Sequence, residues 1–180
     1  MKVLPVSAAV AMAALSIVCP PAFPAKPRQS PATSASAPAN GVVRPAPEFV
    51  WSSVTGKVRR LRDLRGQPVI LIFATGPTAK DFNRQVKEIT KRYRQLAERN
   101  ALFFVAFTKE TGLITRSDVP FIVLPDPESV ADAYRVGDFG IAVIGSDGNL
   151  DYATDRIVPG QRILDVIDNS FRVQSQQRRS

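Results

Sequence analysis

The stretch from Val69 to Phe82 constrains the fold of this chain more than any other. Its first five residues are all apolar, and this length and β-branched content indicate a buried strand. A turn of small residues, Ala74 to Pro77, follows, and a helix is predicted over 79–99. The apolar residues of that helix recur every three or four positions and form one face: Phe82, Val86, Ile89, Tyr93 and Leu96. A second apolar strand over 101–107 then implies a parallel strand pair with a right-handed crossover.

The rest of the chain supplies elements on both sides of this unit. Thr78 is the predicted N-cap of the helix, with Asp81 in a near capping box, and Asn100 is predicted to end it. Asp126 and Pro127 predict the start of a second helix. Further strands are predicted over 47–51, 58–61, 121–124, 139–144 and 150–153, and a C-terminal helix over 163–171. The pattern predicts one α/β domain over 47–172, with a central mixed sheet flanked by helices.

The first 46 residues do not have the composition of a folded domain. One lysine followed by an apolar run predicts a secretory signal peptide over 1–25, and an uncleaved anchor is the alternative. Residues 26–46 are rich in Pro, Ala and Ser and predict a disordered linker. Cys19 lacks the small preceding residue of a lipidated cysteine, so we expect no lipoprotein. We expect a bacterial Sec-type export to the periplasm or the extracellular space, no stable transmembrane segment, and a basic flexible tail over 173–180.

The scarcity of reactive side chains excludes most catalytic chemistry. The chain has one cysteine, Cys19, and no histidine. It therefore cannot form an internal disulfide, a Cys/His zinc site or a Ser-His or Cys-His nucleophile. Its aspartates lie mostly in predicted turns and caps, and the segment from Asp147 to Asp151 is better explained as a hairpin than as a calcium loop. We expect no metal and no cofactor.

Three segments carry a resemblance to a known family. Residues 56–75 match the pattern G-K-x-x-x-L-x-D-L-x-G-x-P-V-x-L-x-F-A-T, residues 120–127 and 130–136 match a middle segment, and Asp147-Gly148 matches a hairpin. The chain thus resembles the AhpC/TSA (redoxin) branch of peroxiredoxins and exported thiol-disulfide proteins. This resemblance implies a thioredoxin-like fold.

The functional positions of that family are not preserved. In the W-C-x-x-C register, Pro77 and Lys80 stand at the two cysteine positions; in the T-x-x-C register, which begins at Thr75, Thr78 stands at the peroxidatic cysteine. Phe139 or Gly140 stands at the position of the family's cis-proline. A threonine hydroxyl ionises far above a thiol and has no sulfur to oxidise. The resemblance therefore implies a thiol site that has lost its nucleophile, and we expect no catalytic residue.

A basic helix face is the remaining candidate site. The formal net charge is +8, and five cations repeat along the helix at steps of four and three: Lys80, Arg84, Lys87, Lys91 and Arg94. With residues 57–62 and the C-terminal tail they predict a surface for an anionic partner. Thr78 and Lys80 at the helix start could also bind a small anion. The alternatives are a solvated helix face and a simple cap at Thr78. Nucleic acid is not expected, because few aromatic residues interleave with the cations.

These observations leave three functional hypotheses. The first is an exported, redox-inactive binding or scaffold module for an unidentified protein, which would not be an enzyme. The second is an antioxidant or thiol-disulfide oxidoreductase that uses a cysteine of its partner. The third is a binder of anionic surfaces or polymers through the basic helix face.

Overall fold

The computed structural model describes residues 44–177, apart from residues 54 and 116. The predicted signal peptide and all but the last three residues of the predicted linker lie outside the described residues. The described part of the chain contains no helix that is long and apolar enough to cross a membrane.

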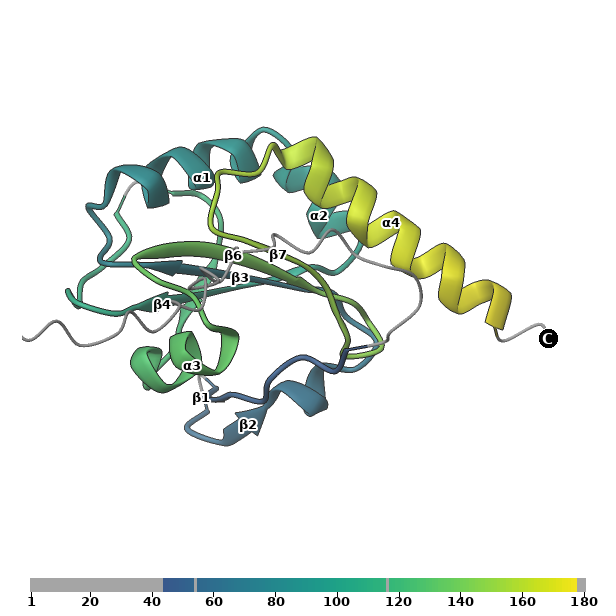
Figure 1. Ribbon diagram of the computed structural model, residues 1–180, viewed down its shortest axis with the longest axis horizontal. Helices are drawn as coiled ribbons and strands as arrows, with labels where there is room; N and C mark the ends of the chain where they lie inside the picture. The colour runs from purple at the N-terminus through teal and green to yellow at the C-terminus, as the bar shows by residue number, and fades with distance from the viewer. Residues whose placement is uncertain (1–43, 54, 116, 178–180) are drawn as a thin grey trace, which may run out of the picture. The chain divides into compact units, whose positions relative to one another are not determined.

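A five-stranded mixed sheet forms the centre of the domain. Its strands lie in the order β5-β4-β3-β6-β7, and the sheet runs between two layers of smaller elements (Figure 1). The strand bounds are β3 Val69–Ala74, β4 Leu102–Phe107, β5 Phe121–Val123, β6 Phe139–Ile144 and β7 Leu150–Thr154. Strands β3, β4 and β5 are parallel, whereas β6 and β7 run antiparallel to their neighbours. The predicted parallel pair, the hairpin and the mixed sheet are confirmed.

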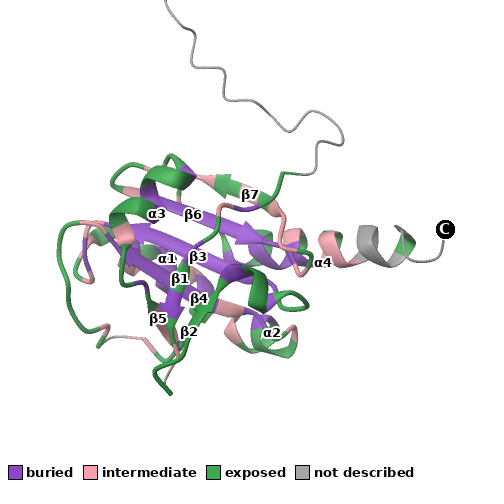
Figure 2. Cartoon of the chain, turned by 90° about the horizontal axis from the view of Figure 1, so that it is seen from below, coloured by how far each residue is buried: buried purple, intermediate pink, exposed green. Residues whose placement is uncertain are grey.

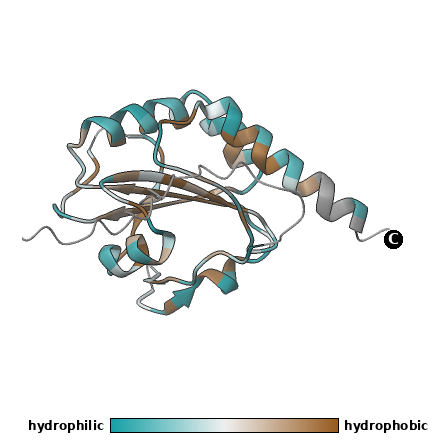
Figure 3. Ribbon diagram, in the orientation of Figure 1, coloured by the Kyte–Doolittle hydropathy of each residue, from teal (hydrophilic) through white to brown (hydrophobic). Residues whose placement is uncertain are grey.

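Each face of the sheet is covered by a different layer. Three helices cover one face, and a two-stranded sheet, a short 3-10 helix and α3 cover the other (Figure 1). The first layer consists of α1 Lys80–Thr90, α2 Tyr93–Glu98 and α4 Gly160–Gln177; the second consists of β1 Val50–Ser52, β2 Val58–Arg60, η1 Leu61–Leu64 and α3 Pro127–Tyr134. Apolar residues concentrate in the sheet and on the inner sides of the helices (Figure 3). The arrangement is a thioredoxin-like sandwich.

Strand β3 is continuously apolar because both of its faces are buried. Ile70, Ile72 and Ala74 belong to the core beneath the helices α1 and α4, while Leu71 and Phe73 belong to the core beneath α3 and β1. The central strands are buried along their length, and the edge strand β7 is not (Figure 2). A strand that packs on two faces cannot show polar alternation, which explains the sequence pattern.

The helix predicted over 79–99 is two helices. Helix α1 ends at Thr90 and α2 begins at Tyr93. The break occurs because the backbone N–H of Arg92 donates to Ile89 O at 2.9 Å, a tighter turn than an α-helix makes, and Arg92 leaves helical geometry at φ −123° and ψ 10°. Asn100 ends α2 in the left-handed region at φ 55°, as predicted.

The cap predicted at Thr78 is wrong. Ala79 is the N-cap of α1, and no side chain caps it. The reason is that the N–H of Ala79 donates to Gly76 O at 3.2 Å, so a turn through Pro77 and Thr78 precedes the helix. By contrast, Asp126 caps α3 as predicted, since its Oδ1 accepts the N–H of Ser129.

The folded part extends slightly beyond the bounds expected from the sequence. The N–H of Leu150 donates to Arg44 O at 2.8 Å, and that of Ala46 donates to Gly148 O at 3.1 Å. Residues 44–46, predicted as linker, therefore pair with the β6–β7 hairpin. Helix α4 continues to Gln177, so residues 173–177 of the predicted flexible tail are helical.

Candidate functional site

The structure brings the degenerate thiol-site positions together at one end of β3. Thr75, Pro77, Thr78 and Lys80 follow one another from the end of β3 into α1. Phe139 begins the neighbouring strand β6 and pairs with Ala74 in register. The position expected for a cis-proline therefore lies beside the turn expected for the nucleophile.

The loop after β4 closes over this turn. The N–H groups of Lys109 and Glu110 donate to Thr75 O at 3.0 and 2.8 Å. Glu110 also packs so tightly on Gly76 that a Cβ added there would lie 2.7 Å from its Oε2. The absence of a side chain at Gly76 thus lets the carboxylate approach the turn.

The carboxylate of Glu110 lies beside the position at which a thiol enzyme stabilises its thiolate anion. The Thr78 hydroxyl donates to Glu110 Oε2 at 3.4 Å, and Asn83 Nδ2 donates to Ala79 O at 2.9 Å. A small anion at Thr78 and Lys80 would therefore meet a negative charge at short range, which disfavours it. Glu110 was not identified from the sequence, because nothing in a loop 32 residues away marks it as a neighbour of Thr78.

The five cations of the basic helix face are all exposed, but most of them have an acidic partner nearby on the same helix. Arg84 pairs with Asp81 at 3.8 Å, Arg94 with Glu98 at 3.4 Å, and Lys91 with Glu88. The Lys91 hydrogen bond lowers the pKa of Glu88, with desolvation acting in the opposite direction. Lys80 and Lys87 are the two cations of this face that have no acidic group within 4 Å in the described part of the chain. The helix break at Arg92 also separates Arg94 from the other four cations.

A cavity of about 220 Å³ lies between α1 and the loop after β4. The buried side chains of Phe82 and Val86 belong to its lining, and Thr78 and Asn83 add polar groups. Leu113 belongs to the same lining and is 87% exposed, the highest value among the exposed large apolar residues of the described chain. The arrangement can accept an apolar group beside the former thiol position. The sequence gave no sign of this cavity, because nothing in the segment Leu113-Ile114 marks it as a neighbour of α1.

The hairpin aspartates make the contacts of a turn. Asp147 Oδ1 accepts the N–H of Asn149 at 3.0 Å, as expected for a turn, and no group of three metal-binding side chains occurs within the described ranges. The pKa of the Asp151 carboxyl is raised to about 6, mainly by burial; a hydrogen bond from Ser170 acts to lower it, and the charge of Asp147 adds to the rise. Asp151 is exposed as a residue, but its carboxylate packs against Gly145.

Comparison with known proteins gives a family match and a set of structural neighbours. The sequence model of the AhpC/TSA family matches residues 42–153, more than half of the chain. No curated protein matches the sequence.

Three solved structures show the range of similar proteins. The thioredoxin domain of a thiol-disulfide oxidoreductase from Bacteroides vulgatus is 17% identical, with 74% of this chain and 98% of that chain covered and a TM-score of 0.54. The exposed lipoprotein thioredoxin of Streptococcus pneumoniae is 20% identical, covering 68% and 99%, with a TM-score of 0.53. A peroxidoxin from Mycobacterium tuberculosis is 16% identical, covering 71% and 96%, with a TM-score of 0.52. At these identities the likeness shows the fold.

Proposed function

The chain belongs to the AhpC/TSA family, and from that premise we propose that it is an exported, redox-inactive member that acts as a binding module. The observation that carries this proposal is the contact between Thr78 and Glu110. At Thr78 a hydroxyl stands where the family has its nucleophile. The neighbouring Glu110 carboxylate is negatively charged, so it opposes the formation of any anion at this position. The chain also has no histidine and no cysteine after Cys19 to supply the chemistry elsewhere.

The proposed binding face is the cavity between α1 and the loop after β4. Its apolar lining lies beside the turn over 75–80 that holds the degenerate thiol-site positions (the degenerate thiol turn), and Leu113 exposes most of its surface to solvent. Covering such a leucine contributes about 1.5–3 kcal/mol to binding, which favours a protein partner that inserts an apolar side chain. The export part of the proposal is supported by the predicted leader over 1–25 and by the pneumococcal neighbour, which is an exposed lipoprotein.

Two assays test the absence of redox chemistry. The purified chain should neither reduce insulin nor consume peroxide, with thiol reductant supplied in excess. Turnover clearly above that of a Cys19→Ser variant would overturn the redox-inactive assignment, because Cys19 is the only sulfur nucleophile available. Turnover that survives this substitution would require a nucleophile that the proposal does not contain, and would overturn it equally.

A pair of matched variants tests the binding face. Leu113→Asp should abolish capture of a partner from the exported fraction, whereas Val123→Asp should not, since Val123 is 48% exposed on the edge strand β5 and does not line the cavity. Capture should also persist at high salt. Equal loss in both variants would contradict docking at this cavity.

The anionic-surface hypothesis keeps one specific observation in its favour. Lys80 and Lys87 are exposed and have no acidic group within 4 Å in the described part of the chain. A Lys80→Glu/Lys87→Glu variant should lose salt-dependent retention on anionic vesicles if the helix face binds them. Retention unchanged by this double reversal would remove the helix face from consideration.

A further inference from the structure

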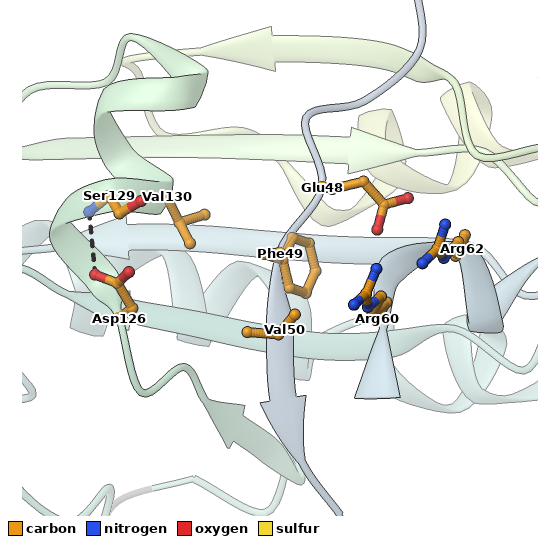
Figure 4. A pocket seen from close by; sticks show the side chains of 8 residues that line it. All are labelled: Glu48, Phe49, Val50, Arg60, Arg62, Asp126, Ser129 and Val130. Atoms are coloured by element: carbon orange, nitrogen blue, oxygen red, sulfur yellow. Dashed lines mark hydrogen bonds between the residues drawn. The ribbon is translucent and has the colours of Figure 1, made fainter. Parts of the chain in front are cut away.

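A second cavity lies on the opposite face of the sheet from α1. It measures about 230 Å³ and is formed where β1, η1 and α3 meet. Figure 4 shows side chains from all three elements around it. None of its lining residues belongs to the degenerate thiol turn or to the basic helix face, so the proposed function does not account for it.

The floor of this cavity is apolar and firmly packed. Phe49 is 3% exposed, and its ring meets that of Phe104 edge-on with centroids 5.3 Å apart. Val130, on α3, is 7% exposed. A floor held in this way does not have to rearrange to receive a ligand, which reduces the entropic cost of binding.

One wall carries two guanidinium groups. Arg60 ends β2 and Arg62 lies in η1, and both side chains lie on the same side of the cavity (Figure 4). Neither has an acidic oxygen within 4 Å in the described chain. The nearby acid Asp63 is engaged by the backbone, since its Oδ2 accepts the N–H of Arg60 at 2.9 Å. Two neighbouring cations repel each other, and a bound anion between them would relieve that repulsion.

The remaining polar groups of the lining narrow the choice of anion. Asp126 lies across the floor from the arginines, where its Oδ1 accepts the N–H of Ser129 at 3.4 Å. Glu48 lies above the Phe49 ring on the same side of the cavity as the arginines, with its carboxylate toward them (Figure 4). Two carboxylates therefore balance two guanidinium groups. A dianion such as phosphate would meet both carboxylates, whereas a single carboxylate with a hydrogen-bond donor behind it matches the two ends of the cavity.

We propose that this cavity binds an α-carboxylate that carries an N–H group behind it, as at the C-terminus of a peptide or in a free amino acid. The carboxylate lies between Arg60 and Arg62, the chain behind it crosses Phe49, and its N–H faces Asp126. Glu48 competes with the ligand for the arginines. The ligand places its carboxylate where planar guanidinium groups can each donate two hydrogen bonds.

Titration of the full chain with four probes tests this assignment. The probes are N-acetyl-trialanine with a free carboxylate, the same peptide with an amidated end, free alanine, and inorganic phosphate. Backbone amide shifts of Phe49 and Val130 in NMR spectra report binding. We expect shifts with the free carboxylate and none with the amide. Alanine as effective as the peptide identifies a free amino acid as the ligand; a peptide that binds more tightly identifies a chain terminus.

Variants separate this site from the rest of the surface. Arg60→Ala/Arg62→Ala should weaken binding by about tenfold or more, and Glu48→Gln should strengthen it. Lys80→Ala/Lys87→Ala removes the same charge from α1 and should leave the affinity for the peptide unchanged, as should Leu113→Asp. The proposal is overturned by phosphate binding as tightly as the peptide, by no shift at about 10 mM peptide, or by unchanged affinity in the arginine variant. These results would leave the apolar cavity beside α1 unaffected.

Discussion

Restoring a cysteine at Thr78 should not restore a reactive thiol. The replacement Thr78→Cys, made in a Cys19→Ser background, places the only thiol of the chain at the position that the family resemblance assigns to the peroxidatic cysteine. Glu110 Oε2 lies 3.4 Å from the present hydroxyl. A thiolate formed there would face that carboxylate, so we expect the thiol pKa to stay near its ordinary value of about 8.5 rather than fall.

The magnitude follows from charge separation and exposure. Two unit charges about 4 Å apart interact by about 1 kcal/mol in water, and about 1.4 kcal/mol corresponds to one pKa unit. Thr78 and Glu110 are both exposed, so the aqueous figure applies and Glu110 raises the thiol pKa by about 0.7 unit. The start of α1 favours the thiolate by about 0.3–1 kcal/mol, which offsets most of this rise.

The pH dependence of alkylation by iodoacetamide measures this thiol pKa. Adding Glu110→Gln should lower it by about 0.7 unit, whereas Glu128→Gln, on α3 at the opposite face of the sheet, should leave it unchanged. A thiol pKa below about 7 with Glu110 in place would refute the reasoning, because the helix terminus would then dominate the carboxylate. So would an identical pKa in the Glu110→Gln variant.

Three further predictions concern stability, each measured by denaturant unfolding. Gln85→Ala should destabilise the fold by about 3 kcal/mol or more, because the fully buried Gln85 donates to Val158 O at 2.9 Å and accepts its N–H at 2.8 Å; a loss below about 1 kcal/mol would contradict this. Gly160→Ala should cost about 1–3 kcal/mol, because its Cβ would lie 2.3 Å from Glu88 O, whereas Gly137→Ala, whose Cβ would meet nothing within 4 Å, should cost less than about 1 kcal/mol. Asp151→Asn should remove a pH dependence: burial raises the Asp151 pKa from 3.8 to about 6, so the folded state binds its proton more tightly and parental stability falls as pH rises through this interval. Allowing for exposure, the variant should be about 1 kcal/mol more stable at pH 7.5 and equal below about pH 4; parallel curves would contradict the assignment.

The sheet could be predicted because its signals are local. The apolar run from Val69 to Phe73 is long enough for a buried strand, and Asp147-Gly148 marks a hairpin between two apolar segments. The break at Arg92 could not be predicted, since Ile89, Tyr93 and Leu96 keep a helical spacing across it. The structure shows that the start of α4 lies beside the break, since a Cβ added at Gly160 would lie 3.0 Å from Arg92 Cγ. The proximity of α4 cannot be read from the periodicity of one segment.

The charges show the same division between local and distant information. The Arg84–Asp81 and Arg94–Glu98 pairs have spacings of three and four on a helix, so their partial neutralisation of the basic face was readable from the sequence. The arginines at positions 60 and 62 were readable as cations, but not as one wall of a cavity, because α3 supplies the other wall from residues 126–130. Position in the folded chain, rather than the number of cations, decides which of them can meet a ligand.

Glu110 explains why the local sequence pattern and the folded structure indicate different anion sites. A strand followed by a turn and a helix N-terminus is a place that favours negative charge, and the sequence therefore suggested an anion at Thr78 and Lys80. In the structure, the chain supplies that negative charge itself, through a carboxylate held 3.4 Å from the Thr78 hydroxyl. An external anion gains little where an internal one already stands. It gains more at Arg60 and Arg62, because two guanidinium groups line one cavity there and neither forms an ion pair within 4 Å in the described chain with the carboxylates of the same lining, Glu48 and Asp126.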